Sequence, residues 1–147
     1  MNEYNIKALH WEYEYIISQD LKKLIEKEGF TGCDFWPVIN HETGKKLKNI
    51  YQMYITGRIP EMSDHTNIVN VPDVEQCSCG KKGYTIKGEI VYNKHSLKSI
   101  SDFNKTKEWV GGGETTWQLL IVTSRVYNLF KKDYITGVRF EPVRVIK

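Results

Sequence analysis

The chain has 147 residues, of which 40% are hydrophobic and 27% are charged, and its formal net charge is +3. This length is enough for one well-buried core and too short for two, so we expect a single domain over residues 1–147. The composition excludes a disordered tail, and charges of both signs without a dominant basic stripe argue against nucleic acid as the partner.

The N-terminal stretch MNEYNIKALHWEYEYII has no basic segment followed by a continuous apolar run, so it does not have the pattern of a signal peptide. No apolar run approaches the roughly 18 residues of a membrane span. Three cysteines, two of them one residue apart, do not make a disulfide framework. We therefore expect a cytoplasmic protein that does not contact a membrane.

The most informative feature along the chain is an internal echo. YIISQDLKKLIEKEGFTGCDFWPV at 15–38 aligns without gaps onto 120–143, at an offset of 105 positions. Both copies contain Thr-Gly followed by Phe-x-Pro-Val at matching positions. This pattern predicts an internal duplication within the domain, in which 15–38 echoes 120–143.

Each copy has the features of a strand, a helix and a second strand. Ser18 and Thr123 follow β-branched or aromatic runs and are suited to cap the first turn of a helix. Apolar residues then recur at i, i+3 and i+4 and give each helix one apolar stripe; they are Leu21, Leu24 and Ile25 in the first copy and Val126, Leu129 and Phe130 in the second. Gly29 is suited to end the first helix in the left-handed conformation.

Between the copies the sequence favours β-structure. Strands are predicted at 50–59 and 67–71, and a hairpin about Lys87-Gly88 is predicted at 84–93. Residues 96–104 fit a short helix or a packed loop, and the triple glycine at 111–113 fits a flexible loop.

The predicted fold class is therefore α+β. It comprises a mixed β-sheet with two strand-helix-strand units, at about 10–40 and 115–146, and a central β-hairpin region. Because no linker divides the chain, we expect the two copies to share one sheet.

The sequence contains no pattern that indicates an enzyme. The triple glycine lacks the lysine and the strand-to-helix setting of a phosphate-binding loop. The four histidines are scattered, and none has an Asp or Ser at the spacing of a catalytic triad. Cys33, at the start of a predicted strand, is typical of a small buried hydrophobe.

Cys77 and Cys79, in Cys-Ser-Cys-Gly, are the candidate metal ligands. A zinc knuckle normally uses C-x-x-C-G, and one residue is missing here. Tetrahedral zinc also needs two further ligands, for which His65 and His95 are candidates. A redox pair and a purely structural turn are the alternatives, and we take the turn as the default, with no cofactor expected.

Two stretches carry a family resemblance: CSCGKKGYTIKGEIVYNKHSLKSISDFNKT at 77–106 and WQLLIVTSRVYNLFKKDYITGVRFEPV at 117–143. Together they resemble the C-terminal half of the double-CXXCG motif family. The first CXXCG of that family is absent, and the second is shortened to C-x-C-G. The resemblance implies a bacterial immunity protein that neutralises a cognate protein toxin.

An immunity protein needs a rigid scaffold with aromatic and charged anchors rather than catalytic groups. Trp36 is a candidate anchor, and His41 and Glu42 in a predicted polar turn are candidate rim residues. The alternative function is a zinc-containing protein- or nucleic-acid-binding domain without catalysis.

Overall fold

The computed structural model describes residues 6–8, 15–71, 83–112 and 115–147. These residues form helices and several β-sheets, with both parallel and antiparallel strand pairs, which confirms the predicted α+β class. Within the described ranges, no helix is long and apolar enough to cross a membrane.

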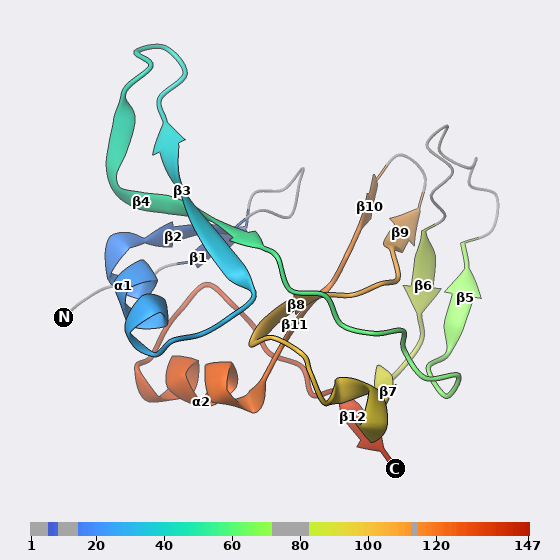
Figure 1. Ribbon diagram of the computed structural model, residues 1–147. Coiled ribbons are helices and arrows are strands. Elements are labelled where there is room, and N and C mark those ends of the chain that lie inside the picture. The colour runs from blue at the N-terminus through green and yellow to red at the C-terminus, as the bar shows by residue number, and fades with distance from the viewer. Residues whose placement is uncertain (1–5, 9–14, 72–82, 113–114) are drawn as a thin grey trace.

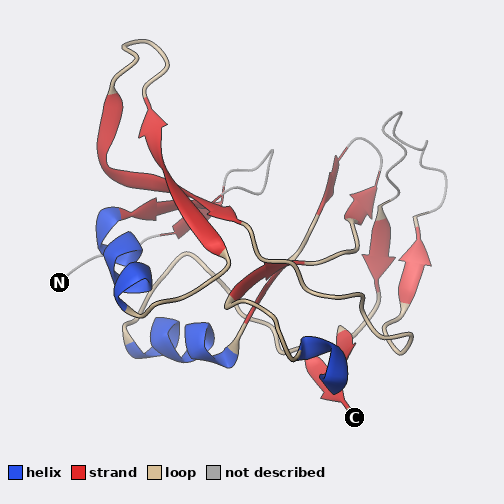
Figure 2. Cartoon of the chain, in the orientation of Figure 1, coloured by secondary structure: helices blue, strands red, loops and turns tan. Residues whose placement is uncertain are grey.

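The first sheet has four strands, all with antiparallel neighbours. Its order is β1 (Ile6–Ala8), β2 (Tyr15–Ser18), β4 (Lys46–Ile55) and β3 (Cys33–Ile39). Helix α1 (Gln19–Lys27) follows β2 directly and lies beside this sheet (Figure 1). The long β3 and β4 form a hairpin that extends away from the rest of the molecule (Figure 2).

The remaining strands form a second four-stranded sheet and two strand pairs. The second four-stranded sheet has the order β10 (Thr115–Trp117), β9 (Val110–Gly112), β6 (Tyr84–Ile86) and β5 (Ile68–Asn70). Strand β11 (Leu120–Val122) pairs with β8 (Phe103–Lys105), and β12 (Arg144–Ile146) pairs in parallel with β7 (Val91–Asn93). The 3₁₀ helix η1 (Lys94–Leu97) follows β7, and helix α2 (Ser124–Lys132) follows β11.

The two helices repeat each other in their hydrogen bonds as well as in sequence. Helix α1 ends with the Glu28 N–H donating to the Leu24 carbonyl at 3.0 Å, and α2 ends with the matching bond from Asp133 to Leu129 at 2.9 Å. Helix α2 begins and ends 105 residues after α1, because the apolar stripe and the Thr-Gly turn recur at the same offset in the sequence. The apolar stripes of both helices then pack into one core.

This main core combines buried side chains of both copies with those of β4 and β8. An apolar side chain buried in this way contributes roughly 1.5–3 kcal/mol to folding. The core residues are Ile17, Leu21, Ile25, Met53, Ile55, Phe103, Val126, Phe130 and Ile135. A second, smaller core contains Ile59, Met62 and Tyr92.

The predicted helix caps differ in their outcome. Ser18 caps α1 as predicted, because its hydroxyl accepts a hydrogen bond from the Leu21 N–H at 3.2 Å. Thr123 occupies the equivalent place before α2 but makes no such bond. Its hydroxyl instead donates to Asp102 Oδ1 at 2.8 Å, so a tertiary contact has replaced the local cap.

The expectation that the two copies share one sheet is wrong. Strands β2 and β3 belong to the first sheet, whereas β11 pairs with β8. In the second copy, residues 138–143 belong to no helix or strand, and β12 begins only at Arg144. Val138 and Phe140 pack against the main core, so this segment is anchored by its side chains rather than by a ladder.

Two predictions for the central region need correction. Strands do form at 84–86 and 91–93, and Gly88 has the expected positive φ of 85°, but these strands do not pair with each other. Strand β6 pairs with β5 and β9 and strand β7 with β12, because more distant partners satisfy their backbone groups. Gly111 and Gly112 lie in strand β9 rather than in a loop.

The Thr-Gly turn of the first copy is held in place by close backbone contacts. The Thr56 and Gly57 N–H groups both donate to the Gly32 carbonyl, at 2.9 and 3.1 Å. A Cβ atom at Gly32 or at Gly57 would collide with the Phe103 carbonyl oxygen. Glycine is therefore required where the start of β3, the end of β4 and β8 meet.

Tyr134 has a strained backbone that its counterpart avoids. Its φ is 52°, and the equivalent residue of the first copy is Gly29 with a φ of 65°. A left-handed conformation costs a non-glycine residue about 1–2 kcal/mol. Because Tyr134 is 88% exposed, it gains little packing in return.

We therefore expect Tyr134→Gly to raise the free energy of unfolding by about 1 kcal/mol in urea titrations. The matched variant is Gly29→Ala, whose new Cβ would meet nothing within 4 Å, so that only the backbone term acts. It should lower stability by about 1 kcal/mol. A loss of stability in Tyr134→Gly would show that the ring makes a stabilising contact.

Candidate functional site: the outer face of the β3–β4 hairpin

The β3–β4 hairpin has one face in the core and one face in solvent. Directly opposite residues share a face, and Phe35 lies opposite Met53 in the main core. The alternate pairs, Asp34 with Tyr54 and Trp36 with Gln52, therefore lie on the outer face. The period-2 pattern of a strand thus places an aromatic pair on the solvent side.

Trp36 and Tyr54 form the centre of this outer face. Their ring centroids lie 6.4 Å apart at an interplanar angle of 43°. Trp36 is 60% exposed and Tyr54 is 39% exposed, although rings of this size are usually mostly buried. Lys105 on β8 places its Nζ 5.0 Å from the Tyr54 ring centroid, within cation–π range.

The hairpin is bent beyond this aromatic pair. Pro37 lies opposite Tyr51 but Ile39 lies opposite Lys46, so β4 contains extra residues between the two pairs. One of these is Asn49, which has a left-handed backbone with a φ of 64°. Such a bulge bends a strand and redirects its side chains.

The turn at the tip is held by its own hydrogen bonds. The Asn40 side-chain carbonyl accepts from the Thr43 N–H at 2.9 Å and from the Thr43 hydroxyl at 3.0 Å. The Asn40 backbone N–H donates to the Lys45 carbonyl at 2.9 Å, and Gly44 takes the positive φ of the turn. The tip is therefore a defined turn.

Exposed apolar and basic side chains occur along the hairpin up to its tip. Ile39 and Leu47 are exposed, and with Trp36 and Tyr54 they are four of the eight exposed large hydrophobic side chains among the described residues. Lys45, Lys46 and Lys48 are also exposed. We call Trp36, Ile39, Leu47 and Tyr54 with these three lysines the hairpin surface.

All three predicted partner-binding residues lie on this hairpin. Trp36 is on the outer face of β3, and His41 and Glu42 are exposed in the turn that follows. Sequence reasoning missed Tyr54, Ile39 and Leu47. Alternation along β3 places Ile39 on the face of Phe35, so its exposure is evident only from the structure, and Tyr54 joins Trp36 only through the pairing register.

The cysteines contribute no reactive site that the structure describes. Cys77 and Cys79 lie outside the described residues, so the predicted metal site stays a prediction. Across the described ranges, no group of three or more His, Cys, Asp or Glu side chains is placed to hold a metal ion. Burial, together with Asp34, Asp102 and Glu26, raises the pKa of the half-buried Cys33 thiol to about 12, so this thiol stays protonated at neutral pH.

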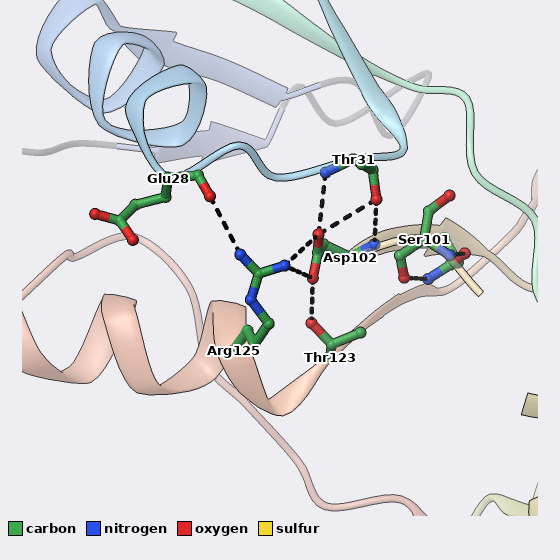
Figure 3. A network of polar contacts seen from close by, with 7 residues as sticks. Glu28, Thr31, Ser101, Asp102, Thr123 and Arg125 are labelled. Atoms are coloured by element: carbon green, nitrogen blue, oxygen red, sulfur yellow. Dashed lines mark hydrogen bonds and ion pairs between the residues drawn. The ribbon is translucent and has the colours of Figure 1, made fainter. Parts of the chain in front are cut away.

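A polar network around Asp102 joins the two copies (Figure 3). The Asp102 carboxylate accepts hydrogen bonds from the Thr31 N–H at 3.1 Å and from the Thr123 hydroxyl at 2.8 Å. Arg125 donates to the same carboxylate at 3.2 Å and to the Glu28 carbonyl oxygen at 3.2 Å. These groups come from both helix units and satisfy one another, so we assign the network a structural role.

An open pocket of about 460 Å³ lies on the opposite part of the molecule, near η1. Glu61 and Lys107 on its wall form an ion pair with each other. The residues that line it are Pro60, Glu61, Met62, Ser63, Asp64, Asn93, Ser96 and Lys107. Glu61 and Lys107 thus already neutralise each other, and we do not place the functional site in this pocket.

Comparisons of the chain with protein-family models, with curated proteins and with solved structures found no match.

Proposed function

We propose that this chain is a bacterial immunity protein, which binds a cognate protein toxin through the hairpin surface and thereby neutralises it. The observation that carries the proposal is the exposed Trp36–Tyr54 pair on a projecting hairpin. Tryptophan and tyrosine are the residues most enriched at the energetic centres of protein interfaces.

The construction of the hairpin supports this role. The inner face of β3 and β4 is fixed in the main core through Met53, Ile55 and Phe35. The outer rings are therefore presented on a rigid base, which lowers the entropy lost on binding. Inhibition by occlusion needs only such a surface, so it requires no catalytic group in this chain.

The proposal is tested by co-expression with the gene that lies next to this one. We expect that gene to encode a secreted protein whose C-terminal domain is toxic when expressed alone in the cytoplasm. Co-expression of this chain should restore growth, and the two purified proteins should elute as one complex.

A chain with Cys77→Ser and Cys79→Ser serves as the comparison for the zinc-containing alternative. The proposed function predicts that this variant still restores growth. Failure of the wild-type chain to rescue growth or to form a complex would refute the proposal. Loss of about one equivalent of zinc together with loss of rescue would favour the alternative.

A further inference from the structure

We infer that the hairpin surface docks into an acidic groove of its protein partner, with the lysine-rich tip entering the groove. This inference rests on the proposed function, because it names the chemistry of the partner surface that the hairpin contacts.

The tip of the hairpin carries an excess of positive charge. Within 40–48 the chain carries Lys45, Lys46 and Lys48 against one acid, Glu42. All four side chains are exposed, and none of them forms an ion pair with a described residue. The tip therefore presents a net positive charge that nothing in the described fold compensates.

The neighbouring apolar side chains distinguish this tip from an ordinary solvated turn. Ile39 is 57% exposed and lies directly opposite Lys46, and the exposed Leu47 follows it. By the alternation of a strand, Ile39 and Leu47 lie on opposite faces of the hairpin. Exposed apolar side chains with charges beside them are the arrangement of a protein interface, in which apolar anchors are buried and a charged rim steers the partner. An acidic surface is the complement of this rim.

The hairpin projects from the body of the molecule, and its tip lies away from both helices (Figure 1). Because Ile39 and Leu47 lie on opposite faces of the hairpin, one partner can bury both side chains only if its surface is concave. The Asn40–Thr43 bonds hold the turn in one conformation, so insertion costs little ordering.

The test is the association rate with the purified toxin domain encoded beside this gene, measured by stopped flow between about 25 and 200 mM NaCl. Wild type should associate faster at low salt, because opposite charges steer the encounter. The triple variant Lys45→Glu, Lys46→Glu and Lys48→Glu should associate at least about tenfold more slowly at low salt and lose this salt dependence.

The matched control is a second triple Lys→Glu variant, which changes the net charge by the same amount at a site away from the hairpin. Lys87 follows β6, Lys94 begins η1 and Lys98 follows it; all three are exposed, and these elements lie away from the hairpin tip (Figure 1). Their triple replacement by Glu should alter the rate by less than about threefold. Circular dichroism and thermal midpoints should be the same for both triple variants as for wild type within a few degrees.

The possible results separate the two proposals. A wild-type complex whose rate ignores salt, or equal effects of the two triple variants, would overturn the acidic groove and leave the proposed function intact. Absence of any wild-type complex would refute the proposed function, and the acidic groove with it. A lower rate confined to the hairpin variant, with a loss of salt dependence, would support the inference.

Discussion

Asp102→Ala is expected to lower the free energy of unfolding by about 3–5 kcal/mol, because it removes a carboxylate that accepts hydrogen bonds from Thr31 and Thr123, and a hydrogen bond to a charged group contributes about 1.5–3 kcal/mol. The Asp102 side chain is 7% exposed and bonds with Thr31, Thr123 and Arg125. Removal of the carboxylate leaves the Thr31 N–H and the Thr123 hydroxyl without this acceptor. It also removes the carboxylate bridge between Thr31 and Thr123, so that only the Arg125–Glu28 bond of this network still joins the two helix units directly.

Two variants test whether the lost stability of Asp102→Ala comes from the buried hydrogen bonds of Asp102 or only from its ion pair with Arg125. The Arg125 side chain is 60% exposed, so Arg125→Ala should cost only about 1 kcal/mol. Glu141 forms an exposed pair with Arg139, and Glu141→Ala should change stability by less than about 0.5 kcal/mol. Urea unfolding measures all three, and a cost below about 1 kcal/mol for Asp102→Ala would contradict the bridging role.

Local patterns were sufficient to predict the helices. The apolar stripes, Ser18 and Gly29 lie within a few residues of the bonds they control, and α1 and α2 form where those patterns begin and end. Thr123 shows the limit of this reasoning. Its capping hydroxyl is engaged by Asp102, 21 residues earlier in the chain, which no local pattern encodes.

Strand partners could not be predicted in the same way. The segments at 84–86 and 91–93 have the alternation and the glycine of a hairpin, yet each pairs with strands that are distant in sequence. An alternating strand specifies its two faces but not its neighbour, because any strand offers the same backbone groups. For the same reason, the strand pattern at 138–143 did not reveal that this segment has no partner strand among the described residues.

The candidate site was predictable only in part for a related reason. Trp36, His41 and Glu42 lie close in sequence, so the turn joins them on one hairpin. Tyr54 and Lys105 complete the aromatic centre through strand register and a contact with β8. The local sequence thus predicted the turn and Trp36, whereas the contacts of Trp36 with Tyr54 and of Tyr54 with Lys105 depend on the tertiary structure.

Trp36→Ala is expected to weaken binding to the toxin domain by about 2–4 kcal/mol, which corresponds to roughly 30- to 1,000-fold in Kd. Tyr54→Ala should cost about 1–2 kcal/mol, since its ring is smaller in exposed area and partly engaged by Lys105. Because the two rings contact each other, the double variant should lose less than the sum of the single losses. Isothermal titration calorimetry measures these affinities directly.

A comparison with Tyr127 separates a binding surface from general aromatic exposure. Tyr127 on α2 is 40% exposed, almost the same as Tyr54, and lies away from the hairpin. Tyr127→Ala should leave Kd within about twofold of wild type, although its edge-to-face contact with Phe140 makes a stability loss of about 1 kcal/mol reasonable. If Tyr127→Ala weakened binding as much as Trp36→Ala, the contact surface would lie on α2 instead. If only Trp36 and Tyr54 affect Kd while the thermal midpoints hold, the outer face of the hairpin is the surface that binds the toxin.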